Sequence, residues 1–443
     1  MKPRRILIAA WAVFVLFGYP GFMRYESIDE LVESRVGFFS DWHSPMLTEV
    51  WRVLGRAFSG PAPLFMLQGT MLLLGTYSLA RRVLPERAAA YTAAAVLLFP
   101  PLIATTALVG EDGTLAAFLV GGAAVLLGES RSRKLGGLAL LMVACGLHEG
   151  AAIAVLPIVV AGLGWPAGRW RQLGVAFLAW IAIVGLAVGI DRLLVDDRTY
   201  RRDVALAMLD ITGTLDHAGT LDDDAILRDL PGVPLAVSKD VQKRARAAHS
   251  HPDKLDRGDT RLFEPTTFDD ERAAIIAGRR QLSRDMPVAY LRHRLHELAH
   301  VLGIKRPSSW HPLLTEFVQN KDTRVLIAHA AHHSLVQRIL IWPVAKLAHT
   351  LLFRPFLYFF LGIVLLPIAI IRRHGLAAMV LISGLAYELA LGIVTYAPAY
   401  SDSQWLMVAT VMTAIVIAMR ELKARHERVF EQAPVAVAHD DRM

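Results

Sequence analysis

The sequence contains little cysteine and little charge. Cys145 is the only cysteine among 443 residues, so an intramolecular disulfide, a cysteine-ligated zinc cluster and a thioredoxin-type pair are excluded. Charged residues make up 20% of the chain and hydrophobic residues 54%, whereas soluble domains carry about 25% charged and roughly 45–50% apolar residues. This composition excludes a soluble enzyme, a secreted disulfide scaffold and a disordered chain.

Other functional signals are also missing. The sequence has no glycine-rich nucleotide-binding loop, which disfavours an ATP-driven pump and a cytosolic nucleotide-sugar enzyme. No internal repeat is visible, and this counts against the inverted-repeat transporters. The net charge is +7, but the basic residues form no stripe interleaved with aromatics, so no nucleic-acid partner is expected.

Hydrophobic residues are concentrated in blocks of about 17–22 residues, the length that crosses the apolar core of a bilayer. The first block resembles a signal peptide, but no small-residue cleavage site follows it, so we interpret it as a retained span. We therefore predict an all-α polytopic membrane protein with about ten transmembrane helices. They lie near residues 6–22, 62–80, 88–109, 113–128, 135–147, 150–164, 173–193, 351–371, 376–396 and 404–420.

Two stretches allow more than one interpretation. Residues 135–164 form either one long helix or a short pair that turns at residues 148–150. We favour the pair, because it keeps the basic residues of all short connections on one side of the membrane. Residues 336–349 are apolar but contain three basic side chains, which predicts a helix lying along the outer membrane surface. An eleventh span is the alternative for this segment.

The basic residues of the connections set the predicted topology. The positive-inside rule identifies their side as cytoplasmic, which places both termini in the cytoplasm and the long loop outside. The residues concerned are Lys2, Arg4, Arg5, Arg81, Arg82, Arg87, Arg131, Arg133, Lys134, Arg169, Arg171, Arg372, Arg373, Arg420, Lys423, Arg425 and Arg428. The predicted organisation is an N-terminal transmembrane module (1–193) with a first outside loop (23–60), an extracytoplasmic helical domain (194–350), a C-terminal transmembrane module (351–420) and a cytoplasmic tail (421–443).

The first outside loop places acidic residues at the membrane boundary. Partial desolvation there is expected to raise the pKa of a carboxyl such as Glu26 towards the range of a general base, and a carboxylate is also a ligand for hard metal ions. Ser40-Asp41 is predicted to begin a helix with Pro45 in its first turn. From the residues alone, an interfacial amphipathic helix with solvated charges is the simpler interpretation.

Short motifs along the chain resemble the bacterial GT-C superfamily of glycosyltransferases, which are polytopic enzymes related to protein mannosyltransferases and to the aminoarabinose transferases of lipid A. The motifs are Glu26-Ser27 and Asp41-Trp42-His43-Ser44-Pro45 in the first outside loop, Gly110-Glu111-Asp112 between the third and fourth spans, Asp210 early in the long loop, and the helix at 287–295. The chain departs from the family pattern at Glu26, where the family usually has Asp, at His148-Glu149-Gly150 and at Ser403-Gln404-Trp405.

The resemblance implies a GT-C-like fold and inverting transfer of a sugar from a polyprenyl-phosphate-linked donor to an envelope glycan, lipid or protein acceptor. Transfer would occur on the non-cytoplasmic face of a bacterial-type inner membrane. Glu26 would take the proton of the acceptor hydroxyl, and Asp112 would orient the acceptor or help to hold a divalent metal ion, with Glu111 as its substitute.

The other residues predicted for this site would bind the substrate or its phosphate. Cations are expected among them, because a phosphate leaving group needs positive charge to stabilise it. The set is Arg24, Asp29, Asp41, His43, Glu111, His148, Glu149, Arg198, Arg201 and Asp210. Arg35, Arg192 and Arg202 also lie where an outer-leaflet phosphate would be met. For any single arginine at this boundary, snorkelling to the membrane surface is the simpler interpretation.

A second motif predicts a different enzyme. His296-Glu297-Leu298-Ala299-His300 has the H-E-x-x-H pattern, in which two His on one helix face bind zinc and the Glu activates a water molecule. This alternative is a membrane-anchored zinc metallopeptidase, and Glu316, His311, His329, His332 and His333 are further ligand candidates. Position 306, where one peptidase class has its third ligand, is Arg. A polar face on an amphipathic membrane-surface helix explains the same residues.

A third possibility is a transporter or flippase of a lipid-linked substrate without covalent chemistry. The outside position of both acidic motifs favours the transferase over this class.

Overall fold

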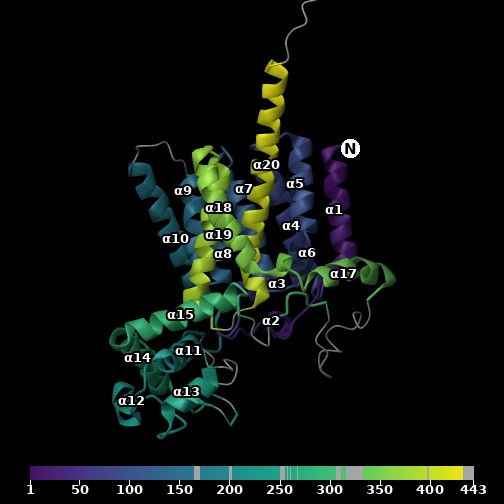
Figure 1. Ribbon diagram of the computed structural model, residues 1–443. Helices are drawn as coiled ribbons and strands as arrows, with labels where there is room; N and C mark the ends of the chain where they lie inside the picture. Colours follow the sequence, from purple (N-terminus) through teal and green to yellow (C-terminus); the bar gives the residue numbers. More distant parts are fainter. Residues whose placement is uncertain are drawn as a thin grey trace, which may run out of the picture.

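A computed structural model describes residues 1–163, 170–198, 202–249, 255–256, 258–259, 261–266, 268–305, 311–315, 333–396 and 399–432, with the side chains of 425–432 left aside. The membrane module contains α1 (Pro3–Gly18), α4 (Ala62–Ala80), α5 (Glu86–Leu98), α6 (Pro100–Ala107), α7 (Glu111–Leu126), α8 (Arg131–Leu147), α9 (Ala151–Gly162), α10 (Trp170–Leu194), α18 (Pro355–Ile371), α19 (Gly375–Val394) and α20 (Gln404–Gln432). These helices lie side by side, and the N-terminus and the end of α20 are at the same end of the bundle (Figure 1).

The all-helical, multi-pass architecture confirms the predicted fold class, and each predicted span coincides with a helix or a bent helix pair. By length and apolar composition alone, four described helical segments are able to cross a membrane: α4, α10, α19 and residues 400–424. Only 17% of the most apolar stretch of α10 is buried within the protein, so its apolar surface requires lipid. The exact number of spans predicted from the sequence, ten, stays a prediction.

The predicted third span, 88–109, is bent. Helices α5 and α6 meet at an angle of 65° and count as one further span if they are taken together. The break lies at Phe99, which has an extended backbone and precedes two prolines. A residue before proline is disfavoured in the helical conformation, and proline donates no backbone hydrogen bond. After the bend, the end of α6 lies beside the chain that follows α1, where the Phe22 N–H donates to the Ala107 carbonyl at 2.8 Å.

The first outside loop forms two helices, α2 (Tyr25–Val36) and α3 (Pro45–Gly55). The predicted helix start at Ser40-Asp41 is wrong, because Ser44 is the N-cap of α3 and its hydroxyl accepts a hydrogen bond from the Leu47 N–H at 3.1 Å. The predicted first-turn position of Pro45 is correct. Helix α2 was not predicted. Its C-cap is Gly37, whose backbone has a left-handed conformation (φ 72°).

The predicted outside region contains α11 (Arg202–His217), α12 (Asp223–Asp229), α13 (Val241–His249), α14 (Asp269–Asp285), α15 (Pro287–Val301) and α17 (Leu335–Leu347). Helices α11 to α15 gather at the end of the bundle opposite the N-terminus, and we call these helices the outside domain (Figure 1). Helix α17 lies across that same end of the bundle. The crosswise position of α17 agrees with the predicted surface helix at 336–349. Helices α8 and α9 form the predicted short pair, with a turn at residues 148–150.

Close packing against α4 extends to the start of α7, which carries Glu111 and Asp112. Helices α4 and α7 approach closely at Gly113, where a Cβ atom would lie 2.0 Å from Gln68 Nε2. Such close approach between membrane helices depends on small residues. Almost every residue of α7 is buried, so the two carboxylates at its start are held in a rigid position.

Candidate active site

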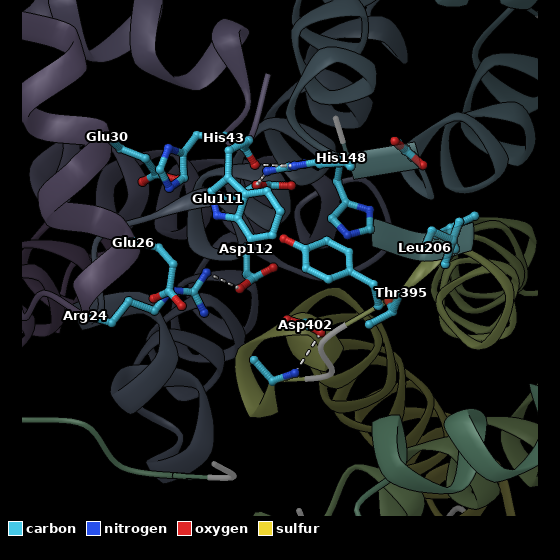
Figure 2. Close-up of a pocket in the computed structure, with 16 residues that line it drawn as sticks. Arg24, Glu26, Glu30, His43, Glu111, Asp112, His148, Leu206, Thr395 and Asp402 are labelled. Carbon is cyan, nitrogen blue, oxygen red and sulfur yellow. Dashed lines mark hydrogen bonds and ion pairs between the residues drawn. The ribbon is translucent and has the colours of Figure 1, made fainter. Parts of the chain in front are cut away.

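A polar cavity of about 140 Å³ opens between the first outside loop, the start of α7, the turn before α9 and the start of α11. Its charged and aromatic lining residues are Arg24, Glu26, Glu30, Trp42, His43, Glu111, Asp112, His148, Glu149, Arg202, Tyr396 and Asp402. Figure 2 shows these side chains converging from segments that are far apart in the sequence. The cavity therefore brings the two predicted catalytic carboxylates, Glu26 and Asp112, into one site.

Backbone pairing places the two acidic motifs beside each other. Phe22 and Leu108 form a parallel bridge, in which the Phe22 N–H donates to the Ala107 carbonyl and the Val109 N–H donates to the Phe22 carbonyl, both at 2.8 Å. The buried Ser27 hydroxyl donates to the Val109 carbonyl at 2.5 Å. The Ser of the first motif thus anchors α2 to the segment immediately before Glu111.

Arg24 connects both predicted catalytic carboxylates. Its guanidinium lies 3.5 Å from a carboxylate oxygen of Glu26 and 3.5 Å from one of Asp112, and it donates to the Ser401 hydroxyl at 3.1 Å. The Asp112 side chain is 7% exposed and that of Glu26 is 53% exposed. Glu26 is therefore about half exposed and faces solvent at the cavity mouth, whereas Asp112 is buried.

A second cation, Arg202, enters the cavity from the start of α11. It donates to a carboxylate oxygen of Glu111 at 2.9 Å and to the Trp42 carbonyl at 2.6 Å. Its position depends on pairing between the chain after α10 and the first outside loop, where the Asp41 N–H donates to the Asp197 carbonyl at 3.0 Å. Two arginines, which remain charged at any physiological pH, consequently face the same small cavity.

Glu30 lies one helical turn after Glu26, and its side chain is almost completely buried. Burial raises the pKa of Glu30 to about 8, although the nearby charges of His43 and Arg24 lower it. Burial is the largest influence on His43 and lowers its pKa, but the hydrogen bond to Glu33 and the charges of Glu30 and Glu33 together outweigh burial, so the net pKa is raised. At neutral pH Glu30 is mostly protonated, so it can donate a hydrogen bond to a ligand and is a poor proton acceptor.

Replacing Glu30 with Gln is expected to raise the melting temperature by several degrees at pH 8.5 and to have little effect at pH 5. The pKa of Glu30 is raised from 4.5 to about 8 in the folded protein. The folded state therefore retains a proton that the unfolded chain releases, and stability falls as the pH rises through this window. The side chain of Gln cannot ionise, so the Glu30→Gln variant does not lose stability in this way as the pH rises. Thermal unfolding of both proteins across this pH range tests the effect, and a difference that does not depend on pH would contradict it.

The structure gathers seven of the predicted site residues in the cavity: Arg24, Glu26, His43, Glu111, Asp112, His148 and Glu149. Asp29, Asp41 and Arg198 do not line it. Arg198 is exposed and donates to the Arg192 carbonyl at 3.3 Å. Arg201 lies outside the described residues.

Asp210, a predicted substrate contact, lies in the core of the outside domain and is 1% exposed. Its carboxylate pairs with Arg279 at 2.6 Å, with Arg294, and with His293 Nε2 at 3.2 Å. All of its close charged neighbours come from α14 and α15. The prediction that Asp210 binds substrate is therefore not supported by its position, and its contacts are those of a residue that joins helices.

Three solved structures are similar to most of the chain. An oligosaccharyltransferase of Archaeoglobus fulgidus in the apo form has 12% identity and a TM-score of 0.33, and the match covers 98% of this chain and 52% of that one. This chain thus spans about half its length. ArnT from Cupriavidus metallidurans bound to undecaprenyl phosphate has 15% identity and a TM-score of 0.34, covering 96% of this chain and 78% of that one. ArnT from Cupriavidus metallidurans in the apo state has 14% identity and a TM-score of 0.34, and the match covers 92% of this chain and 77% of that one.

No family model and no curated protein matches the chain. At TM-scores of 0.33 to 0.34 the superpositions are loose, so these similarities do not assign a function to this chain.

Among the charged and aromatic residues that line the cavity, Glu30, Tyr396 and Asp402 were not predicted. Glu30 is four residues after Glu26, a spacing that places two side chains on one face of a helix, so recognition of α2 would have indicated it. Asp402 belongs to a short 3-10 helix before α20 and accepts a hydrogen bond from the Ala399 N–H at 2.9 Å. Nothing in the local sequence around Tyr396 or Asp402 indicates that they approach α7.

The H-E-x-x-H residues lie in the outside domain and do not line the cavity. The rings of His296 and His300 are 4.5 Å apart, but Glu297 is 2% exposed and its carboxylate lies 3.3 Å from His249 Nε2. A metallopeptidase needs this Glu beside a metal-bound water molecule that substrate can reach, and the burial of Glu297 does not provide that. Arg306, Glu316, His329 and His332 lie outside the described residues.

Proposed function

We propose that this multi-pass membrane protein is a glycosyltransferase that moves a sugar from a polyprenyl-phosphate-linked donor to an envelope glycan, lipid or protein. The observation that carries the proposal is the cavity in which Arg24 lies beside Glu26 and Asp112, and Arg202 lies beside Glu111. Cations that can grip a phosphate and a carboxylate that can accept a proton are the two requirements of such a transfer.

In the proposed reaction, the acceptor hydroxyl oxygen attacks the anomeric carbon of the donor sugar. The bond between that carbon and the phosphate oxygen breaks, its electron pair leaves with the polyprenyl phosphate, and the configuration inverts. Glu26 takes the hydroxyl proton. Its exposure at the cavity mouth supports this role, because an incoming acceptor can reach it. Arg24 and Arg202 stabilise the negative charge that develops on the phosphate.

The arrangement of the cavity carboxylates decides whether a divalent metal ion fits this site. Glu111 is paired with Arg202, while Arg24 holds both Glu26 and Asp112. Among the described residues, the groups of three whose ligand atoms lie within 4.8 Å of one another all belong to the outside domain. The cavity carboxylates thus do not fit a metal ion well, and the proposed mechanism takes its positive charge from the arginines.

The proposed site lies on the non-cytoplasmic side. The large outside domain and the cavity share one end of the bundle, and the N-terminus is at the other end (Figure 1). The basic connections support a cytoplasmic N-terminus by the positive-inside rule. We therefore place the reaction on the outer face of a bacterial-type inner membrane, where lipid-linked sugars face the envelope.

Mass spectrometry of envelope glycans and lipid-linked sugars in a deletion strain tests the proposed function. The strain is complemented with the wild type, with Glu26→Gln or with His300→Ala, which removes a metal ligand of the H-E-x-x-H motif, each checked for expression. We expect one sugar modification to disappear in the deletion strain and to return with the wild type and His300→Ala. With Glu26→Gln the rate of sugar transfer should fall about 10²–10⁴-fold, the usual contribution of a general base. The sugar modification should therefore be strongly reduced in that strain.

Two outcomes would contradict the proposal. Unchanged glycans and lipid-linked sugars in every strain would remove the transferase function. Full complementation by Glu26→Gln together with failure of His300→Ala would instead favour the metallopeptidase.

A further inference from the structure

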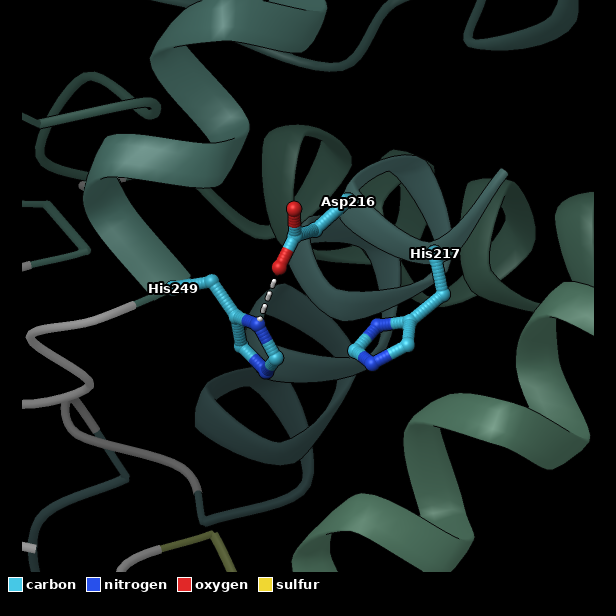
Figure 3. Close-up of side chains that lie close together, drawn as sticks. All are labelled: Asp216, His217 and His249. Carbon is cyan, nitrogen blue, oxygen red and sulfur yellow. Dashed lines mark hydrogen bonds and ion pairs between the residues drawn. The ribbon is translucent and has the colours of Figure 1, made fainter. Parts of the chain in front are cut away.

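Histidines from three helices meet inside the outside domain, away from the proposed transfer cavity. His217 ends α11, His249 ends α13, and His293 lies on α15. The ring centroids are 5.5 Å apart for His217 and His249, and 5.1 Å apart for His249 and His293. Figure 3 shows Asp216 and His217, adjacent at the end of α11, both directed toward His249. The proposed transferase reaction uses none of these residues.

His249 is oriented by a carboxylate. Its Nδ1 lies 2.9 Å from Asp216 Oδ2, and Asp216 also accepts a hydrogen bond from Arg246 Nε at 3.0 Å. With the Nδ1 proton donated to Asp216, the lone pair of Nε2 points toward Glu297 Oε1, which is 3.3 Å away. Two atoms that carry lone pairs are therefore close together in a buried position.

His293 repeats this arrangement from the opposite side. Its Nε2 lies 3.2 Å from Asp210 Oδ1, and its Nδ1 lies 3.8 Å from the same Glu297 Oε1. The ring fits because residue 213 is glycine, since a Cβ atom there would lie 2.0 Å from His293 Nδ1. Both histidines thus have a carboxylate behind them and direct their other nitrogen at one oxygen of Glu297.

We propose that His249 Nε2, His293 Nδ1 and Glu297 Oε1 bind a zinc ion in the outside domain. In a tetrahedral site with metal–ligand distances of about 2.0–2.1 Å, neighbouring ligand atoms lie about 3.3 Å apart. The observed separations from Glu297 Oε1 are 3.3 and 3.8 Å. All three ligands are 9% exposed or less, and imidazole nitrogens favour zinc over magnesium or calcium.

The surroundings of these ligands match those of known metal sites. A ligating histidine usually donates its other N–H to a carboxylate or a backbone carbonyl. Asp216 and Asp210 provide this for His249 and His293. The ring of His217 lies 5.5 Å from that of His249 between centroids, and its Nδ1 lies 2.9 Å from the Gly213 carbonyl.

This site differs from the H-E-x-x-H zinc site that the sequence suggested. Glu297 acts here as a metal ligand and not as a base, and His296 and His300 are not needed. The ion would connect α11, α13 and α15, so we expect it to stabilise the outside domain. It is independent of the proposed sugar transfer, which uses the separate cavity. A protonated His249 bridging Asp216 and Glu297 explains the same distances without a metal, and the experiment separates the two.

Zinc binding to the purified full-length protein in detergent tests the proposal. The protein is first stripped with a chelator and then titrated with ZnCl₂, with bound metal measured by mass spectrometry. We expect one zinc per chain in the wild type and in the control variant His296→Ala/His300→Ala. His249→Ala is expected to lose the ion. Asp216→Asn, which removes only the orienting carboxylate, should bind about 10- to 100-fold more weakly.

Cobalt(II) supplies a second measurement that needs no substitution, because a tetrahedral site gives it an intense visible absorption. Absence of stoichiometric zinc and of this absorption in the wild type would overturn the proposal and favour the protonated His249. Equal affinity of Asp216→Asn and the wild type would also overturn it. Loss of zinc only in His296→Ala/His300→Ala would assign the ion to the H-E-x-x-H residues instead. If His249→Ala does not fold, Asp216→Asn and the cobalt spectrum still decide.

Discussion

Replacing Arg24 with Gln is expected to lower the rate of sugar transfer by about 10²–10³-fold, the loss that follows removal of one preorganised charge-stabilising donor. Arg24 contacts Glu26 and Asp112 at 3.5 Å each, so it lies where a leaving phosphate would meet the catalytic carboxylates. The variant also leaves the buried Asp112 without its cation. Initial rates with the lipid-linked donor found in the strain analysis provide the measurement.

Arg198→Gln is the matched control for this prediction. Both arginines belong to the set predicted from the sequence to bind phosphate, but Arg198 is exposed and does not line the cavity. We expect its transfer rate to remain within about 2-fold of the wild type, as is usual for surface substitutions away from a site. Equal losses in both variants would show that the cavity does not hold the phosphate. A loss in Arg24→Gln that accompanies a lower melting temperature would be repeated with Arg24→Lys, which keeps the charge.

The sequence indicated the membrane helices well because lipid imposes a simple rule on them. A span needs a long apolar block, and such blocks can be read directly from the sequence. The bend at Phe99 followed from Pro100 and Pro101, whose effect on a helix is local, but it was not predicted because the block stays apolar through the break. The short outside helix α2 is not apolar, with three acidic residues before residue 31, and no rule of hydrophobicity marks it.

The site was predictable where its residues lie on short motifs and not where it depends on contacts across the fold. Glu26 and Asp112 were recognised from their motifs, and the structure places both in one cavity. The burial of Glu30 depends on how α2 packs, which the sequence does not show. The partners of Asp210 lie on α14 and α15, about 70 to 85 residues further along the chain, since Arg279 and Arg294 are the residues concerned.

Replacing Asp210 with Asn is expected to destabilise the outside domain by about 3–5 kcal/mol, the usual cost of removing one partner from a buried ion pair. The carboxylate is 1% exposed and lies between Arg279, Arg294 and His293. Its loss leaves Arg294, 5% exposed, as a buried charge with a weakened set of partners. Surface ion pairs are worth only about 0–1 kcal/mol, so the expected effect is well outside that range.

Hydrogen–deuterium exchange separates this structural role from the substrate contact that the sequence suggested for Asp210. A melting temperature of the whole protein is less informative, because domains of a large protein can unfold separately. We expect amides of α11, α14 and α15 to exchange faster in Asp210→Asn, while those of the membrane helices stay protected. Asp270→Asn, at an exposed position on α14, is the control and should leave exchange unchanged. If Asp210→Asn instead exchanges like the wild type but raises KM for the donor, then Asp210 binds substrate, and the outside domain must change its conformation to expose this carboxylate.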